Sequence, residues 1–362
     1  MKPTLTHHAI LPKHLSGFAQ HVIIALSVLQ SISSDVPHSR GVTVRYTIHL
    51  LCCATLVLLN GCERKPETVW PDKPGPKVLT SFAPVSSFAQ NVVGNDGTVK
   101  TMLTSKGPHD HGDPTDEHLK LARTADVLLI NGLGIDNELA IRLRKSAGNS
   151  ALNPVAIGDR VPKDDRFEGA CHHAHHEPGE VHDHGDDPHV WLSPKLAGLM
   201  VESIRDELKR ADPAHAAGYD ARTSAYLEKL KQLETDGINL LKDKKERRII
   251  TFHDSLRYFG DNFGIQIADF IQPEPGVDPS GSRMKKIIEF CKEKGIRVIA
   301  VEPQFSRNTA AGTILKELRD AGIDAEFVEI DTLETADPAE LTPEFYELRM
   351  RKNLENLARV LR

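Results

Sequence analysis

Residues 248–270 read RIITFHDSLRYFGDNFGIQIADF. The β-branched run at 248–252 predicts a buried strand, residues 254–263 favour a helix, and residues 265–270 return to an extended pattern. Neighbouring parallel strands need a crossover connection, and a helix usually supplies it. A strand, a helix and a second strand in this order therefore indicate parallel α/β packing.

The same alternation continues on both sides of this stretch. Further strands are expected at 78–82, 99–103, 127–130, 154–157, 297–301 and 325–330, and further helices at 117–124, 135–145, 283–294, 310–321 and 345–361. A chain of 362 residues is also too long for one ordinary hydrophobic core. The sequence therefore predicts two α/β lobes with mainly parallel sheets, one at 77–212 and one at 248–362.

The segment between the lobes, residues 213–247, favours a long helix. After Pro213 it contains no proline, and its apolar residues recur near helical spacing, namely Leu227, Leu230, Leu233, Ile238 and Leu241. One helix of roughly thirty residues would be about 45 Å long and would join the lobes as a stiff spine. The pattern leaves open an alternative of two helices broken near Gly237.

The beginning of the chain is typical of an exported lipoprotein. In residues 45–62, RYTIHLLCCATLVLLNGC, a basic residue precedes an apolar run that is too short for a comfortable membrane span. The run ends in Leu59-Asn60-Gly61-Cys62, which resembles the lipobox whose cysteine is lipidated. We therefore expect an export signal with an upstream extension at 1–61 and a proline-rich tether at 62–76. A chance apolar run or an uncleaved anchor is the alternative.

The composition excludes one class of partner. The formal net charge of −6 leaves no basic surface of the kind that nucleic acid requires. Cys52, Cys53 and Cys62 belong to the export segment. The remaining two cysteines, Cys171 and Cys291, form no CxxC pair, so we expect independent thiols, with a disulfide between them as the alternative. The informative excess is histidine, at 18 residues, because it is clustered.

Three histidines stand where ligands gather in an open α/β fold. His253 lies where a buried strand ends, His109 follows the strand at 99–103, and His189 lies in a loop stiffened by Pro188 and Pro194. Ligands bind outside the carboxyl ends of such strands, so these side chains can converge in one cleft. Three imidazoles and one carboxylate suit tetrahedral Zn²⁺. A single histidine at a strand end is more often a cap or a satisfied polar group, so the hypothesis depends on the whole set.

A denser group of histidines follows Cys171. It is too polar to pack in a core and is typical of a solvated loop, assigned to residues 171–186. Weak, multivalent metal capture and a simple spacer are two compatible interpretations. The auxiliary metal-binding candidates are His111, which lies close to His109, and the tract residues His172, His173, His175, His176, His182 and His184.

An ordered set of motifs carries a resemblance to a known family. Its most specific block is Asp187-Pro188-His189-Val190-Trp191-Leu192-Ser193-Pro194. The others are Pro108-His109, Asn131-Gly132-Leu133-Gly134, Thr251-Phe252-His253-Asp254, Val301-Glu302-Pro303-Gln304-Phe305-Ser306 and Ile330-Asp331. Over nearly all of residues 77–362, the chain resembles the zinc and manganese substrate-binding proteins of bacterial ABC importers, a family that includes ZnuA and lipoprotein adhesins.

The resemblance implies a ligand set by position. His109, His189 and His253 match three ligand positions of the family, and Asp331 matches the fourth, a carboxylate of the C-terminal lobe. Glu302 matches a recurrent acidic position that orients a ligand histidine. Manganese-type members tend to carry glutamate where His253 stands, so the resemblance favours Zn²⁺ over Mn²⁺, which prefers oxygen ligands. Cu²⁺, Ni²⁺ and Co²⁺ remain alternatives.

One departure affects the first ligand. After it the family usually shows an aromatic residue and a glutamate, whereas His111 and Gly112 stand here, so His111 is a rival to His109. The implied function is capture of Zn²⁺ outside the cytoplasm and delivery to the permease of an ABC importer, by a monomer anchored to the cell membrane through lipid. No enzyme activity is expected.

Three other functions remain alternatives. One is a binding protein for manganese or another divalent metal, and another is a surface adhesin. The third is a zinc hydrolase with Glu302 as its base. Against the hydrolase, the sequence has no HExxH motif, and four protein ligands would leave no open coordination position for a substrate.

Overall fold

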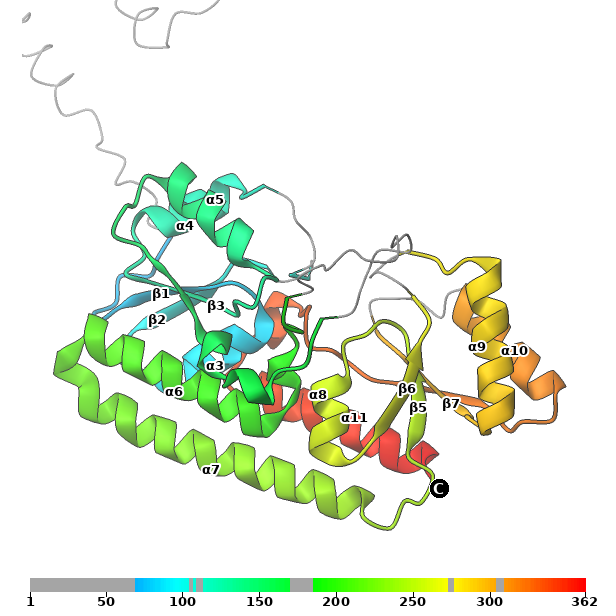
Figure 1. The fold of residues 1–362 in the computed structure, drawn as a ribbon. Coiled ribbons are helices and arrows are strands. Elements are labelled where there is room, and N and C mark those ends of the chain that lie inside the picture. The colour runs from blue at the N-terminus through cyan, green and yellow to red at the C-terminus, as the bar shows by residue number, and fades with distance from the viewer. Residues whose placement is uncertain (1–68, 104–106, 109–112, 170–184, 273–276, 304–308) are drawn as a thin grey trace, which may run out of the picture. The chain divides into compact units, whose positions relative to one another are not determined.

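The computed structural model describes residues 69–103, 107–108, 113–169, 185–272, 277–303 and 309–362 (Figure 1). These lie in one compact unit, Thr68–Arg362. The expected export signal, Cys62 and the first part of the tether lie outside the described residues. Within the described part, no helix combines the length and the apolar character that a membrane crossing requires.

The first lobe contains a parallel sheet of four strands. Its order is β2-β1-β3-β4, built from β1 Lys77–Thr80, β2 Thr98–Thr101, β3 Val127–Ile130 and β4 Pro154–Ala156. From β1 the chain continues first to one side and then to the other, so the order reverses between β1 and β3. The crevice at the carboxyl ends of these two strands is where open α/β sheets bind ligands.

The second lobe repeats this topology. Its sheet, also parallel, has the order β6-β5-β7-β8, with β5 Arg248–Thr251, β6 Gln266–Phe270, β7 Val298–Val301 and β8 Glu326–Glu329. The predicted pair of α/β lobes with parallel sheets is therefore confirmed. The reversal lies between β5 and β7, and the residues that follow these two strands include His253 and Glu302.

Helices connect and cover the strands. Those of the first lobe are α3 Ala83–Val93, α4 Asp116–Arg123, α5 Asn137–Ala147 and α6 Pro194–Ala211. Those of the second lobe are α8 Arg257–Phe263, α9 Gly281–Lys294, α10 Thr309–Asp320 and α11 Phe345–Val360. Short 3₁₀ turns occupy Ile157–Arg160, Lys163–Asp165, Val190–Leu192, Pro213–His215 and Pro338–Glu340.

Two of these helices have no counterpart in the sequence-based expectation. The apolar residues of helix α3, which include Val85, Phe88 and Val92, do recur at helical spacing, and its serines Ser86 and Ser87 are buried as well. Helix α6 begins at Pro194, which the sequence suggested was a loop stiffener. Proline fits the first turn of a helix because its missing N–H has no partner there, and the Ser193 hydroxyl caps the same end by accepting from Leu196 N.

The segment between the lobes forms one helix, α7 Ala216–Leu241, preceded by a 3₁₀ turn. The prediction of a single long helix is confirmed, and the alternative break near Gly237 is absent. A Cβ at Gly237 would lie 2.5 Å from Phe263 and 2.8 Å from Leu354, so glycine permits close packing there. Figure 1 shows α7 beside α6 and α11, both of which it contacts.

The hydrophobic core links the two sheets. One cluster of buried side chains contains Leu128 of β3 together with Ile249 of β5 and Leu357 of α11. A second cluster, which includes Ile287 and Ile314, packs α9 and α10 against the second sheet. A shared core holds the carboxyl ends of both sheets in a fixed relation, which is what a site between lobes requires.

Candidate metal centre

Two histidines and a glutamate converge between the lobes. His189, His253 and Glu334 are buried, and each offers a ligand atom within 4.8 Å of the others. Glu334 Oε1 lies 3.6 Å from His189 Nε2 and 3.7 Å from His253 Nε2. Tetrahedral zinc with bonds of about 2.0 Å has ligand atoms about 3.3 Å apart, so the three ligand atoms, now within 4.8 Å of one another, would draw closer together around one ion.

The loop that carries His189 is fixed from both lobes. From the first lobe, Asn131, which follows β3, donates its side-chain N–H to the Pro188 carbonyl at 3.1 Å. From the second lobe, the Tyr258 hydroxyl of α8 donates to the Asp187 carbonyl at 3.0 Å. The His189 ring is therefore placed by two hydrogen bonds to the residues directly before it.

Carboxylates hold the far side of each ligand ring. His189 Nδ1 lies 2.7 Å from Asp187 Oδ1, and His253 Nδ1 lies 2.5 Å from Glu302 Oε1. A carboxylate accepts the Nδ1 proton, which leaves Nε2 of each ring directed at Glu334. Such partners fix the ring orientation and increase the basicity of a ligand histidine. Glu302 thus contacts one of the two converging histidines.

The electrostatic environment favours a cation. Burial lowers the pKa of His189, but the charge of Asp187, the hydrogen bond to Asp187 and the nearby Glu334 carboxylate outweigh it and raise the pKa to about 10. Burial likewise opposes charge on His253, whose pKa is nevertheless raised above its ordinary value by Glu302 and Glu334. In the ion-free chain protons supply the positive charge, and a divalent ion can replace them.

The carboxylate expected from the sequence lies slightly apart. Asp331 Oδ1 accepts a hydrogen bond of 2.8 Å from Leu333 N, and its Oδ2 lies 3.4 Å from Arg349 Nη1. Burial raises the pKa of Asp331 to about 6, although Leu333 and Arg349 lower it. Asp331 is not a member of the converging group found among the described residues, and Glu334 supplies the carboxylate there.

Sequence reasoning missed Glu334. The signal available was an acidic residue three positions after Asp331, in the loop that leaves β8. Leu333 adopts φ 63°, a left-handed conformation that turns the chain at this point. Because the chain turns between Asp331 and Glu334, the two side chains point in different directions. No local pattern in the sequence predicts this turn.

The other histidines predicted to bind metal are not among the residues that the structure describes. His109, His111 and the tract residues His172, His173, His175, His176, His182 and His184 lie outside the described residues. Gly107 is described, and a Cβ built on it would lie 3.3 Å from Glu334 Oε2. The segment that leads to His109 therefore passes beside the metal centre.

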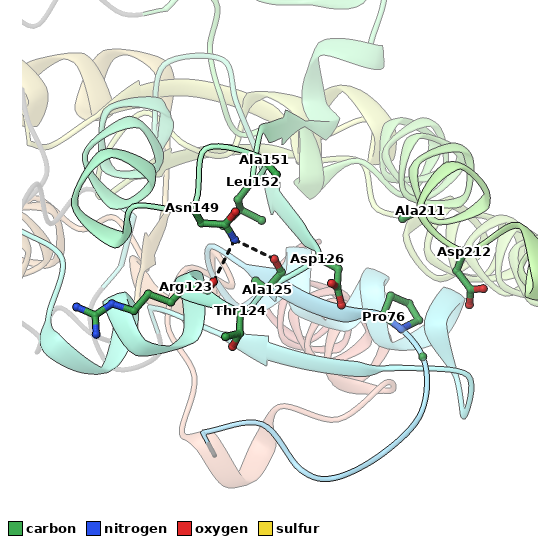
Figure 2. Close-up of a pocket in the computed structure, with 11 residues that line it drawn as sticks. Pro76, Arg123, Thr124, Ala125, Asp126, Asn149, Ala151, Leu152, Ala211 and Asp212 are labelled. Carbon is green, nitrogen blue, oxygen red and sulfur yellow. Dashed lines mark hydrogen bonds between the residues drawn. The ribbon is translucent and has the colours of Figure 1, made fainter. Parts of the chain in front are cut away.

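A separate pocket of about 630 Å³ lies at the opposite edge of the first sheet (Figure 2). Most of its lining residues precede β1, β3 or β4, and Ala211 and Asp212 lie at the end of α6, whereas ligand crevices follow the strands. Its polar groups hold the chain together: Asn149 donates to the carbonyls of Arg123 and Ala125 (Figure 2), and Asp126 accepts from Lys77 N. This pocket is not part of the metal centre.

A family model described as the periplasmic zinc-uptake complex component A, ZnuA, matches residues 78–360. The chain belongs to the ZnuA family. Its members are binding components of uptake systems and not enzymes, which removes support from the hydrolase alternative.

Relatives named for zinc binding and zinc uptake match this chain over most of its length. The zinc-binding protein AdcA of Streptococcus pyogenes serotype M6 is 33% identical over 294 residues, which cover 78% of this chain and 55% of AdcA. The chain thus spans about half the length of the AdcA relatives it matches. The high-affinity zinc uptake system protein ZnuA of Bacillus subtilis is 27% identical over 270 residues, 73% of this chain and 83% of that protein.

A solved structure also confirms the ZnuA-family architecture. The substrate-binding protein FpvC of Pseudomonas aeruginosa, in complex with Mn²⁺, superposes with a TM-score of 0.67 at 25% identity. The match covers 78% of this chain and 97% of FpvC. The two-lobed fold is therefore shared over almost the whole of that protein.

Proposed function

We propose that this ZnuA-family chain captures Zn²⁺ outside the cytoplasm and delivers it to an ABC-type membrane importer. The observation that carries the proposal is the convergence of His189 Nε2, His253 Nε2 and a Glu334 carboxylate oxygen within 4.8 Å, buried between two lobes. Relatives named for zinc binding and zinc uptake support the same cargo. Binding of a metal ion without catalysis requires only a set of ligands, and the buried centre provides three of them.

The ligand set proposed is His189, His253 and Glu334, completed by His109, with His111 as its rival. Asp331 is the alternative carboxylate. A set rich in imidazole suits Zn²⁺, whereas Mn²⁺ prefers more oxygen. The general order of divalent-metal affinities would also allow Cu²⁺, Ni²⁺ and Co²⁺ to bind. Selection of zinc must therefore depend on the geometry of the site and on which metals are available to the protein.

The remaining parts of the proposal concern location and partners. We propose that Cys62 is lipidated, that residues 62–76 tether a monomer to the outer face of the cell membrane, and that the permease of the importer receives the ion. The proposed boundaries place the N-terminal lobe at 77–212, the linking helix at 213–247 and the C-terminal lobe at 248–362. We also propose that the histidine tract at 171–186 collects zinc weakly and multivalently.

Metal analysis of the protein, purified without chelator and without nickel resin, tests the proposal most directly. One zinc ion per chain, retained through dialysis and bound more tightly than Mn²⁺ in calorimetric titration, is the expected result. His189→Ala and His253→Ala should each abolish tight binding. His215→Ala is the matched control, because His215 pairs with Asp212 outside the converging group and should leave affinity unchanged. Unaltered affinity in both ligand variants would refute the assignment.

A further inference from the structure

His118, outside the proposed ligand set, contacts both sides of one loop. His118 Nδ1 lies 3.3 Å from Thr115 N, and His118 Nε2 lies 3.2 Å from the Met102 carbonyl oxygen. Met102 directly follows β2, and Thr115 is the N-cap of α4. A single imidazole therefore joins the two ends of the connection at 103–114.

The partners dictate the state of the ring. A backbone N–H can only donate, so Nδ1 must accept from Thr115. A carbonyl can only accept, so Nε2 must carry the proton and donate to Met102. Both bonds exist together only in the neutral Nε2–H tautomer. Protonation at Nδ1 would place the Nδ1–H of His118 opposite the backbone N–H of Thr115. Two donors cannot form a hydrogen bond, so the bond to Thr115 would be lost.

The loop joined in this way reaches the metal centre. Gly107 lies beside Glu334, with 3.3 Å between a Cβ built on it and Glu334 Oε2. The same connection contains the candidate ligand His109. Holding the ends of a loop together restricts the conformations open to the residues between them. The position of Gly107 against Glu334 therefore depends in part on the His118 ring.

The surroundings of His118 keep its ring neutral. It lines a pocket of about 380 Å³ in which the charged residues are Lys100 of β2 and Glu117 of α4, while α3 contributes Gln90 and the loop after β8 contributes Leu341. Burial lowers the pKa of His118 below its ordinary value of 6.5, although the Met102 carbonyl and Glu117 raise it.

Helix α5 also packs against α4, but it adds no charged group to this pocket within the described part of the chain. Its Arg142 lies 3.7 Å from Asp113 and 3.3 Å from Glu138. Lys100 and Glu117 are thus the charged residues that line the pocket around the ring. One is positive and one is negative, so their effects on a charged ring oppose each other.

We propose that His118 is a positioning residue of the metal centre. This inference rests on the proposed function. The neutral ring of His118 ties Met102 to Thr115 and keeps the connecting loop beside Glu334, so acid weakens zinc binding through His118 as well as through the ligands. The neutral ring persists above pH 6.5, and its bond from Thr115 N is lost as pH falls through the lowered pKa, whereas Nε2 still donates to the Met102 carbonyl. This effect has the same sign as protonation of the ligands, and variants are needed to separate them.

Titration of the full chain with zinc chloride from about pH 7.5 to about pH 5.5 tests the inference. At the upper pH, His118→Ala should bind about three- to tenfold more weakly than wild type, because two hydrogen bonds are lost. The difference in affinity between the two proteins should narrow as pH falls, because the charged ring of wild type loses the bond from Thr115 N. His118→Gln keeps a neutral acceptor at the capping-box position, so its advantage over His118→Ala should not change with pH.

Two further readouts make the result decisive. His215→Ala, the matched histidine control, should keep the wild-type pH profile. Imidazole nitrogen NMR of the ion-free chain at about pH 7.5 should show His118 as the neutral Nε2–H tautomer. An affinity ratio between wild type and His118→Ala that stays constant with pH would overturn the inference, as would a charged ring or the other tautomer. Wild type that binds no zinc would overturn the proposed function instead, and the NMR result would still decide on His118.

Discussion

The Trp191 indole Nε1 donates a hydrogen bond of 2.8 Å to the Thr332 carbonyl. Trp191 stands two residues after His189, and Thr332 stands two residues before Glu334, so this bond joins the ligand segments of the two lobes. The Trp191 carbonyl in turn accepts from the Tyr346 hydroxyl of α11 at 2.7 Å. The distance between an imidazole of one lobe and a carboxylate of the other is thereby set by a bond between their neighbours.

Replacing Trp191 tests this relationship. Trp191→Phe keeps a buried ring but removes the N–H, and it should weaken zinc affinity about three- to tenfold, equivalent to roughly 1 kcal/mol for one buried hydrogen bond. Trp70→Phe is the matched control, because Trp70 Nε1 donates to the Leu121 carbonyl at 3.1 Å away from the metal centre. Calorimetric titration should show the loss in the first variant only. Equal zinc affinities of Trp191→Phe and wild type would mean that the Trp191–Thr332 bond does not fix the spacing of the ligands.

Two carboxylate variants decide which acid binds the metal. Glu334→Gln should weaken zinc affinity by at least about 100-fold, since even groups that only orient ligands contribute about 10- to 100-fold. Asp331→Asn should have a smaller effect, because the Asp331 carboxylate is already engaged by Leu333 N and Arg349. Competition titrations against a zinc indicator would measure both. The opposite order of effects would assign the ligand to Asp331, as the sequence resemblance implies.

A methyl group at Gly107 should disturb the centre. The added Cβ of Gly107→Ala would lie 3.3 Å from Glu334 Oε2 and would press on the carboxylate. Crowding of this kind costs about 1 kcal/mol or more, so affinity should fall roughly fivefold to tenfold. Gly312→Ala is the matched control, since a Cβ there meets nothing within 4 Å. Zinc binding by Gly107→Ala at wild-type strength would show that the loop is not held against Glu334.

Zinc binding should release protons. In the ion-free chain the pKa of His189 is raised from 6.5 to about 10, so the ring is charged at neutral pH and must lose a proton when Nε2 binds zinc. Apparent affinity should therefore fall as pH falls. Calorimetry in two buffers with different heats of ionisation would count the protons. A binding heat that is the same in both buffers would show that no proton is displaced.

The same shift has an opposite consequence for the stability of the ion-free chain. Because the folded pKa of His189 lies above the ordinary value, the stabilisation is complete below pH 6.5 and is lost as pH rises to about 10. Thermal unfolding without metal should therefore show a lower melting temperature at pH 10 than at pH 6.5. Added zinc should remove this difference, since the ion then takes the place of the proton. A melting temperature that does not change across this range would contradict the raised pKa.

The sequence by itself determined most of the local elements and suggested two residues of the candidate metal centre. Alternating strands and helices predicted both parallel sheets, and apolar spacing predicted the single helix α7, because hydrophobic periodicity is set by residues close together in the chain. His189 and His253 could be proposed as ligands because each stands in a short motif, at a loop or a strand end, that belongs to an ordered set of motifs along the chain.

Only the tertiary structure decided which groups meet. Helix α3 buries Ser86 and Ser87 together with its apolar face, and its amphipathic sequence does not predict that the polar face is covered as well. Glu334 enters the centre because Leu333 turns the chain and because Trp191 holds Thr332 from 141 positions away in the sequence. His118 joins Met102 to Thr115 only when β2 and α4 are packed together. Contacts between distant segments depend on the three-dimensional arrangement of the whole core, and no local pattern of residues encodes them.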